Sequence, residues 1–252
     1  MIALTHIPSP NMHACERTFV PQTAIDHALA TRQHAAYCKL LADCGAKVVT
    51  LDVNAGFPDC TFIEDTATVL DELAILPPMG AVSRRAEQAA IEPFLEAHRP
   101  IARIHLPATI DGGDVLRVGR RLLIGESRRT NSAGIAALTL ILKRYGYRVT
   151  RVPVRGCLHL KTACTALPDG HLLVNPGWLE SSALADFQIV HVPTGEPWSA
   201  NVALLGPNVL MPAAHPQAAE LVCKLGFTVR TVDLSEFAKA EGGVTCLSLF
   251  IS

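Results

Sequence analysis

The sequence predicts an α/β propeller, a ring of five similar units, and three observations support this fold class. A helical stretch followed by a strand occurs five times, at intervals of roughly 40 to 55 residues. Pairs of apolar runs separated by turn residues precede four of these helices. Both ends of the chain are strand-like, so a fifth pair can form between them. An ordinary open α/β sheet is the alternative interpretation of the same pattern.

Each unit ends with a helix and a strand. Three of these strands have similar sequences, namely CGAKVVTLD (44–52), YGYRVTRVP (145–153) and LGFTVRTVD (225–233). Two further strands fit at 101–107 and 187–193, and helices are predicted near 24–41, 84–98, 131–145 and 178–185. In the third of these helices, apolar residues recur at helical spacing, at Ile135, Leu138, Leu142 and Tyr145.

The other half of each unit is a hairpin. Four hairpins are predicted, at 61–76, 114–125, 160–174 and 201–211, two of them with clear turn signals at Asp169-Gly170 and Gly206-Pro207-Asn208. The missing fifth hairpin is expected from pairing of the N-terminal run IALTHIP with the C-terminal run VTCLSLFI. That pairing closes the ring and removes an exposed sheet edge. Residues 1–252 are therefore expected to form one domain.

Composition excludes several classes of protein. The chain has 252 residues, a net charge of −1 and 49% hydrophobic residues, with no basic cluster that would indicate nucleic acid or an anionic membrane. No signal peptide and no apolar run of about 18 residues is found. Eight cysteines occur without a C-x-x-C pair, which favours reduced thiols and a cytoplasmic location.

Polar residues gather at equivalent places in the units. Four stretches precede or open the first strand of a unit, namely FPDCTFIED (57–65), TIDGGD (109–114), GCLHLKT (156–162) and GGVTCLSL (242–249). In a ring, these positions meet at one end of the axis, so six side chains are expected to converge as an active site: Asp59, Glu64, Asp65, Asp111, His159 and Cys246. Glu64 and Asp65 are adjacent in a strand of buried type, and a cationic ligand would pair them.

Each of these residues also has a simpler interpretation. Asp-Gly-Gly-Asp is typical of a turn, a single histidine in an apolar run is typical of a hydrogen-bonded core, and Cys246 could pack as a small hydrophobe. Zinc or manganese is the rival use of the set. No H-E-x-x-H, H-x-H or cysteine pair at zinc spacing is found, so no metal is predicted.

Six motifs in order resemble the dimethylarginine dimethylaminohydrolases, which belong to the pentein or guanidino-group-modifying superfamily. They are FPDCTFIED, Ser83-Arg84-Arg85, ATIDGGDVL, GESRRTN, LHLKT (158–162) and GGVTCLSL, and together they extend over nearly the whole chain. The resemblance implies a five-bladed α/β propeller, in agreement with the repeats. It also implies hydrolysis of Nω-methylated arginine to citrulline and dimethylamine through a covalent cysteine thiouronium, with no cofactor.

The resemblance implies a role for each matching residue. The catalytic set is Cys246 as nucleophile, His159 as general acid and base, and Asp111 as the carboxylate that orients His159. The implied substrate-binding set comprises Asp59, Glu64 and Asp65, which hold the guanidinium or position the site, Arg84 and Arg129 for the α-carboxylate, and a backbone carbonyl near Ala240 for the α-amine. A loop near Glu16 is expected to cover the site, without an assigned residue.

Several alternatives stay open at this point. Arg128 is adjacent to Arg129, and Cys60 and Cys157 lie close in sequence to proposed site residues. The same residues would serve an arginine deiminase or another guanidino or ureido hydrolase. A non-catalytic propeller would have no reason to hold these residues together, and a thiol protease would not need adjacent buried carboxylates. The expected partner is a small molecule, and the sequence leaves a homodimer open.

Overall fold

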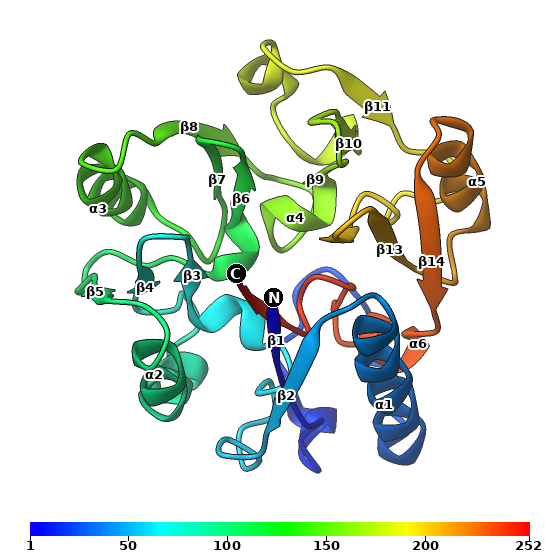
Figure 1. Cartoon of the computed structure of the whole chain (residues 1–252). Coiled ribbons are helices and arrows are strands. Elements are labelled where there is room, and N and C mark those ends of the chain that lie inside the picture. Colours follow the sequence, from blue (N-terminus) through cyan, green and yellow to red (C-terminus); the bar gives the residue numbers. More distant parts are fainter.

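The computed structural model describes residues 1–252 and contains five three-stranded sheets arranged around a central axis (Figure 1). In every sheet the first two strands pair antiparallel and the last two pair parallel. The main helices lie on the outside of the ring, and both chain ends lie near its centre (Figure 1). The five predicted units are thereby confirmed in their strand pairing.

The sheets combine strands in the following orders. They are β15 (Leu249–Ile251), β1 (Ile2–His6) and β2 (Lys47–Leu51); β3 (Thr68–Val69), β4 (Ala74–Leu76) and β5 (Ile101–Arg103); β6 (Val115–Val118), β7 (Arg121–Glu126) and β8 (Arg148–Pro153); β9 (Cys164–Ala166), β10 (Leu172–Val174) and β11 (Ile189–His191); and β12 (Ala203–Leu205), β13 (Asn208–Pro212) and β14 (Thr228–Val232).

The helices connect the parallel strands or lie in the segments between blades. They are α1 (His27–Asp43), α2 (Gln88–Glu96), α3 (Ser132–Lys143), α4 (Leu160–Ala163), α5 (Pro216–Lys224) and α6 (Ser235–Ala238). Short 3₁₀ turns are η1 (Met12–Ala14), η2 (Ile63–Thr66), η3 (Val82–Glu87), η4 (Gly112–Asp114), η5 (Pro176–Trp178) and η6 (Ser181–Leu184). None of the helices combines the length and the apolar character needed to cross a lipid bilayer.

The third unit shows how local sequence builds a blade. The side chain of Asn131 accepts a hydrogen bond from Gly134 N at 2.7 Å and so caps the start of α3. Ile135, Leu138 and Leu142 are buried on one face of this helix and pack in a core cluster with residues of β6 and β7. The predicted helical spacing therefore places its apolar residues in the core.

Strand β15 closes the ring. It pairs antiparallel with β1, with Ile2 opposite Ile251 and Leu4 opposite Leu249, while β1 pairs parallel with β2. Leu4, Leu249 and Ile251 are buried in one apolar cluster that also includes residues of the next blade. The predicted pairing of the chain ends is confirmed, and both edges of β1 are covered by a neighbouring strand.

The structure differs from the prediction in four segments. The hairpin predicted at 160–174 begins with the helical turn α4, and its strands are only β9 and β10. The fourth unit has the two 3₁₀ turns η5 and η6 in place of a helix near 178–185. Glu64 and Asp65 lie in the 3₁₀ turn η2, not in a strand, and the first strand of that blade contains only Thr68 and Val69. Cys246 lies in a turn before β15. Residues in a turn are not restricted to the alternating faces of a strand, so neighbouring side chains can be aimed at different partners.

Candidate active site

One pocket brings together seven of the residues that the sequence singled out. Its lining includes Asp59, Asp65, Arg84, Arg129, His159, Ala240 and Cys246. All of these residues lie on turns or loops outside the strands, contributed by different units of the ring. Asp111 is fully buried behind His159, and Glu64 faces a different cavity. The expected convergence of polar residues is therefore observed, except for Glu64.

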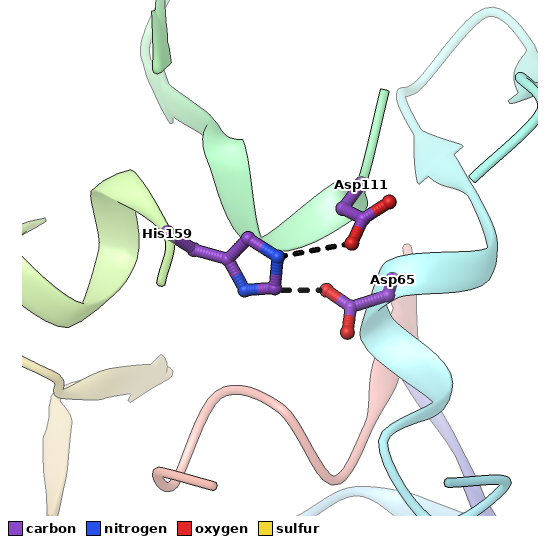
Figure 2. Close-up of side chains that lie close together, drawn as sticks. All are labelled: Asp65, Asp111 and His159. Carbon is purple, nitrogen blue, oxygen red and sulfur yellow. Dashed lines mark hydrogen bonds and ion pairs between the residues drawn. The ribbon is translucent and has the colours of Figure 1, made fainter. Parts of the chain in front are cut away.

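His159 faces two carboxylates (Figure 2). Its Nε2 lies 3.0 Å from Oδ2 of Asp111, and its Nδ1 lies 3.7 Å from Oδ1 of Asp65. Burial disfavours the imidazolium, but the charge of Asp65 and the hydrogen bond to Asp111 outweigh it and raise the pKa of His159 to about 9. Near neutral pH this histidine therefore carries a proton that it can donate.

Asp111 is held in a fixed orientation by its neighbours. Its Oδ1 accepts a hydrogen bond from Gly80 N at 2.8 Å, which leaves Oδ2 directed at His159. Its own backbone N–H donates to Oγ1 of Thr130 at 3.1 Å. With 0% of its surface exposed, Asp111 is well placed to orient the imidazole ring and not to contact a ligand.

Arg84 occupies a place that the sequence did not predict. Its guanidinium donates to Oδ2 of Asp65 at 2.6 Å and to both carboxylate oxygens of Glu87 at 3.0 Å. It also donates to the carbonyl oxygens of Asp59 and Phe62. Arg84 lines the pocket, but it is the cation that stabilises buried Asp65. The predicted contact between Arg84 and a substrate carboxylate is thus not its main interaction in this structure.

The charge of Asp65 is maintained by its neighbours. Burial alone would raise the pKa of Asp65, but His159, Arg84 and the N–H of Gly113 reverse this and lower it. The Gly113 N–H donates to Oδ1 at 3.1 Å. Asp65 therefore presents a permanent negative charge beside His159.

Glu64 does not line the pocket, and its contacts favour the second of its two implied roles, positioning the site, over contact with a bound guanidinium. One carboxylate oxygen accepts from Nζ of Lys161 at 2.6 Å, and the other accepts from Oγ1 of Thr245 at 2.7 Å. The sequence indicated a cationic ligand as the partner of the adjacent carboxylates, but two cationic side chains of the protein itself pair with them. Lys161 pairs with Glu64 and Arg84 pairs with Asp65, because unpaired buried carboxylates would be costly without any ligand.

Cys246 is the thiol of the pocket. Its Sγ accepts a hydrogen bond from Gly243 N at 3.3 Å. Burial, together with the negative charges of Glu64 and Asp65, raises the pKa of Cys246 to about 12 in the unliganded protein. Cys60 and Cys157 do not line this pocket, and burial raises the pKa of both. Cys157 instead donates to the carbonyl oxygen of His159 at 3.2 Å.

Two groups at the pocket have no partner in the protein. The guanidinium of Arg129 makes no hydrogen bond or ion pair, although Arg129 is only 8% exposed. The carbonyl oxygen of Ala240 accepts no hydrogen bond. Neighbouring Arg128 is exposed and lies over the ring of Phe19, 5.4 Å from its centroid. A free cation and a free acceptor in one pocket suit the carboxylate and ammonium of an amino acid.

The loop that follows η1 is tied to the pocket by two carboxylates. Asp59 accepts from Glu16 N through both of its oxygens at 3.2 Å, and Glu241 accepts from the backbone N–H groups of Thr18 and Phe19. Burial raises the pKa of Asp59 to about 6, although Arg84 opposes the shift. Asp59 therefore anchors the loop around Glu16, which lines the pocket and is the loop expected to cover the site, called the covering loop below. The sequence did not predict this anchoring role.

The cluster around His159 also has the composition of a metal site. The nearest ligand atoms of Asp65, Asp111 and His159 all lie within 4.8 Å of one another. These atoms already bind protein groups, since Asp111 accepts from Gly80 and His159, and Asp65 accepts from Arg84 and Gly113. The fixed positive charge of Arg84 also competes with a cation. The donor set therefore suits proton transfer better than metal binding.

Sequence reasoning missed three charged residues around the site. Lys161 lies within the motif LHLKT, and a lysine in an apolar run is a signal for a buried carboxylate partner. Glu87 follows Arg84 by three residues, the spacing of an ion pair on one helix face. Glu241 has a φ of 60°, unusual for a residue with a side chain, and no sequence signal marks it.

Comparison with known proteins gives consistent matches. Residues 52–197 match the family model described as arginine deiminase. An N(G),N(G)-dimethylarginine dimethylaminohydrolase of Pseudomonas aeruginosa is 36% identical over 226 residues, 89% of each chain. One from Streptomyces coelicolor is 38% identical over 255 residues, covering 98% of this chain and 95% of the relative. The solved structure of the Pseudomonas aeruginosa enzyme, a cysteine-to-serine mutant in complex with citrulline, superposes with a TM-score of 0.91 at 33% identity, covering 98% of this chain and 97% of that one.

Proposed function

The chain belongs to the dimethylarginine dimethylaminohydrolase family, and on that basis we propose that it hydrolyses Nω-methylated arginines to citrulline and dimethylamine or methylamine. It is a hydrolase of carbon–nitrogen bonds other than peptide bonds, built on the five-bladed pentein propeller. Its substrate is a small molecule. Asymmetric dimethylarginine and monomethylarginine are the expected substrates.

One observation carries the proposal. A thiol, Cys246, and a protonated imidazole, His159, line the same pocket as an unpaired guanidinium, Arg129. A nucleophile and an acid are what cleavage of a guanidino C–N bond needs at one end of the substrate. A cation is what the substrate carboxylate needs at the other end. A protein that only bound amino acids would not need the first two groups.

The first step is attack by sulfur. A bound guanidinium places a positive charge beside Cys246 and Asp65, which favours the thiolate over the thiol, and the thiol proton passes to solvent. The thiolate forms a bond to the guanidinium carbon. His159 donates its proton to the departing dimethylamine nitrogen as the C–N bond breaks, leaving a covalent S-alkylthiouronium on Cys246. Asp111 keeps the imidazole directed at this nitrogen.

The second step is hydrolysis of that intermediate. His159, now neutral, takes a proton from a water molecule as its oxygen bonds to the same carbon. The C–S bond then breaks, and sulfur takes the remaining proton of the new hydroxyl group, so that citrulline is released and the thiol is restored. His159 is again protonated, and the proton released to solvent in the first step is taken up by the dimethylamine product. Apart from solvent water, all groups that move protons in this scheme are side chains of the protein, so the scheme uses no cofactor.

The substrate's amino-acid end is expected to bind at Arg129 and Ala240. Arg129 would pair with the α-carboxylate, and the carbonyl oxygen of Ala240 would accept from the α-ammonium, since neither has another partner. Arg84 retains a place in the lining and contributes positive charge to the same pocket. Asp65 would balance the charge of the guanidinium.

Arginine deiminase activity is the second candidate. The match of residues 52–197 to the arginine deiminase family model favours it, because the same nucleophile and acid–base pair would release ammonia from unmethylated arginine. The difference lies in whether the space around the terminal nitrogens admits methyl groups. Comparison of kcat/KM for arginine and for methylated arginines decides between the two activities.

The test is a citrulline assay over a panel of single substrates with purified protein. The panel contains arginine, monomethylarginine, asymmetric and symmetric dimethylarginine, and agmatine, with Cys246→Ser as the blank. The ureido group is the signal, because symmetric dimethylarginine would give Nω-methylcitrulline and agmatine would give N-carbamoylputrescine. We expect citrulline from asymmetric dimethylarginine and monomethylarginine, with kcat/KM well above that for arginine. A higher kcat/KM for arginine would establish the deiminase, and no citrulline from any substrate would refute both.

The eight free cysteines support a cytoplasmic location, because reducing compartments maintain thiols. A homodimer stays a prediction, for which light scattering of the purified protein is the direct measurement.

A further inference from the structure

Asp114 is a buried carboxylate that does not line the pocket and has no part in the chemistry above. It is 0% exposed and lies at the end of η4, three residues after Asp111. Its Oδ1 accepts from Leu160 N at 2.8 Å, and its Oδ2 accepts from Oγ of Ser127 at 2.6 Å. Each of these hydrogen bonds connects Asp114 to the backbone next to a proposed active-site residue, His159 in one case and Arg129 in the other.

The first route leads to His159. Leu160 N–H belongs to the peptide unit that joins His159 to α4, and Asp114 is its hydrogen-bond partner. Fixing this peptide unit fixes the direction in which the His159 side chain leaves the backbone. The negative charge of Asp114 also acts on the imidazole, after the charge of Asp65 and the Asp111 hydrogen bond, and favours its protonated form.

The second route leads to Arg129. The Ser127 hydroxyl donates its single proton to Asp114 and accepts from Arg129 N at 3.0 Å and from Thr130 N at 3.2 Å. Thr130 in turn accepts from the backbone of Asp111. The turn that presents the unpaired guanidinium of Arg129 is therefore built around the Ser127 hydroxyl, and Asp114 holds that hydroxyl in place.

The neighbouring strand is shaped to admit this carboxylate. A Cβ atom at Gly125 in β7 would lie 2.4 Å from Oδ1 of Asp114 and 2.8 Å from Cβ of Leu160. Any side chain at position 125 would displace Asp114 and Leu160. The close approach of strand, carboxylate and α4 therefore depends on the absence of a side chain at this place in β7.

We infer that Asp114 is a positioning residue that holds His159 and Arg129 in one fixed arrangement. A single buried carboxylate thereby sets the distance between the acid that acts at the guanidinium end of the substrate and the cation that binds its carboxylate end. The inference rests on the proposed function for the roles of His159 and Arg129. It assigns to Asp114 no contact with substrate.

Two variants separate the routes. Asp114→Asn keeps the size of the side chain but removes its charge, and its amide group cannot accept from both Leu160 N and the Ser127 hydroxyl. Ser127→Ala keeps the charge of Asp114 and its bond to Leu160 N, and removes the hydroxyl that joins Asp114 to the Arg129 turn. Glu196→Gln is the matched control, because Glu196 is a buried carboxylate that accepts from Gln217 N and Ala218 N away from the pocket.

We expect Asp114→Asn to lower kcat/KM for asymmetric dimethylarginine by about 100-fold, through both kcat and KM, since small displacements of catalytic groups have effects of that order. Ser127→Ala should raise KM by about tenfold and change kcat less, consistent with loss of one supporting hydrogen bond. Glu196→Gln should leave both constants within about twofold of the wild type.

An NMR titration of the His159 imidazole, without substrate, provides a readout that does not depend on turnover. Asp65, Asp111, Asp114 and Cys246 are the titratable groups around this ring, and only Asp114 is changed. We expect the pKa of His159 to fall in Asp114→Asn and to stay unchanged in Glu196→Gln. An unchanged His159 pKa, or kinetic constants equal to those of Glu196→Gln, would overturn the inference.

The same measurements separate this inference from the proposed function. Wild-type protein that makes no citrulline would refute the function, while a lowered His159 pKa in Asp114→Asn would still show that Asp114 acts on the imidazole. If Asp114→Asn does not fold, Ser127→Ala decides, because an effect on kcat equal to that on KM, or no effect at all, contradicts a separate route to Arg129.

Discussion

Gly113 lies so close to His159 that a Cβ atom at position 113 would come within 2.6 Å of Nδ1 of the imidazole and 2.9 Å of Oδ1 of Asp65. The second glycine of TIDGGD is thus required for the approach of the histidine and the carboxylate. Its backbone N–H also donates to Asp65. The motif is a turn, as its composition indicates, but its glycine serves the packing of the active site.

Replacement of this glycine should disable catalysis without removing any functional group. We expect Gly113→Ala to lower kcat by about 100-fold or more, because His159 or Asp65 must move by a large fraction of an ångström. Gly56→Ala is the control, since a Cβ atom there meets nothing within 4 Å. Steady-state kinetics of both variants give the answer, and equal activity would contradict the packing argument.

The two arginines of the pocket should respond differently to truncation. Arg129→Ala removes an unpaired guanidinium, so KM for dimethylarginine should rise by a factor equivalent to about 1.5–3 kcal/mol, with little change in unfolding free energy. Arg84→Ala leaves buried Glu87 without its cation and Asp65 with His159 alone, and should destabilise the fold by about 3–5 kcal/mol.

Urea unfolding and kinetics on both arginine variants test this contrast. Equal stability of the two variants would show that Arg84 is not the cation on which the buried carboxylates depend. Agmatine, which lacks the carboxylate, should be a poor substrate for the wild type. The KM for agmatine should also be insensitive to Arg129→Ala, because the contact partner is missing from the ligand.

The Cys246 thiol should titrate only at high pH in the free protein. Burial and the charges of Glu64 and Asp65 raise its pKa to about 12, so alkylation by iodoacetamide at neutral pH should be slow and should accelerate with pH. Mass spectrometry should place the label that causes inactivation on Cys246, and bound substrate should protect it. Cys246→Ser should retain the fold and lose citrulline production. Full activity in that variant, with labelling of Cys60 or Cys157, would mean that another thiol is the nucleophile.

Stability should fall with pH across the titration of His159. Its pKa is raised from 6.5 to about 9 in the folded protein, so protonated His159 stabilises the fold fully below pH 6.5. That contribution, on the order of 1–3 kcal/mol, is lost as the pH rises from 6.5 through 9. Thermal unfolding of the wild type and of His159→Gln, compared from slightly acidic to alkaline pH, measures the difference. If the melting temperatures of the two proteins changed with pH in parallel, the result would contradict a raised pKa of His159.

The covering loop should open more often when Glu241 is changed. Glu241→Gln replaces one acceptor oxygen by an amide that faces a backbone N–H of Thr18 or Phe19, so at least one anchoring hydrogen bond is lost. We expect amide hydrogen exchange of residues 16–20 to accelerate by about tenfold. Exposed Glu180→Gln serves as the control. Unchanged exchange in this loop would show that Glu241 does not hold it closed.

The repeat of helices and strands could be predicted from the sequence because it depends on local periodicity and on turn residues. Closure of the ring by β15 followed from the need to cover the edge of β1. The convergence of His159, Asp111 and Cys246 followed from their equivalent places in the units. By contrast, the partners of Glu64 and Arg84 depend on side-chain directions in the 3₁₀ turns η2 and η3, which periodicity does not determine. The tie between Glu241 and the covering loop joins segments at opposite ends of the chain, and no local signal predicts it.

The antiparallel pairing of β1 with β15 also makes the order of blades along the chain arbitrary. The same antiparallel contact joins β6 to β7, with Val118 opposite Arg121 across a short turn. A circular permutant that links residues 252 and 1 and opens this turn would keep every strand pair. Its chain ends would lie in the third blade, where pairing of β6 with β7 would close the ring. The ring therefore specifies which blades are neighbours but not which blade comes first, so a gene for this fold could begin in any of its five hairpins.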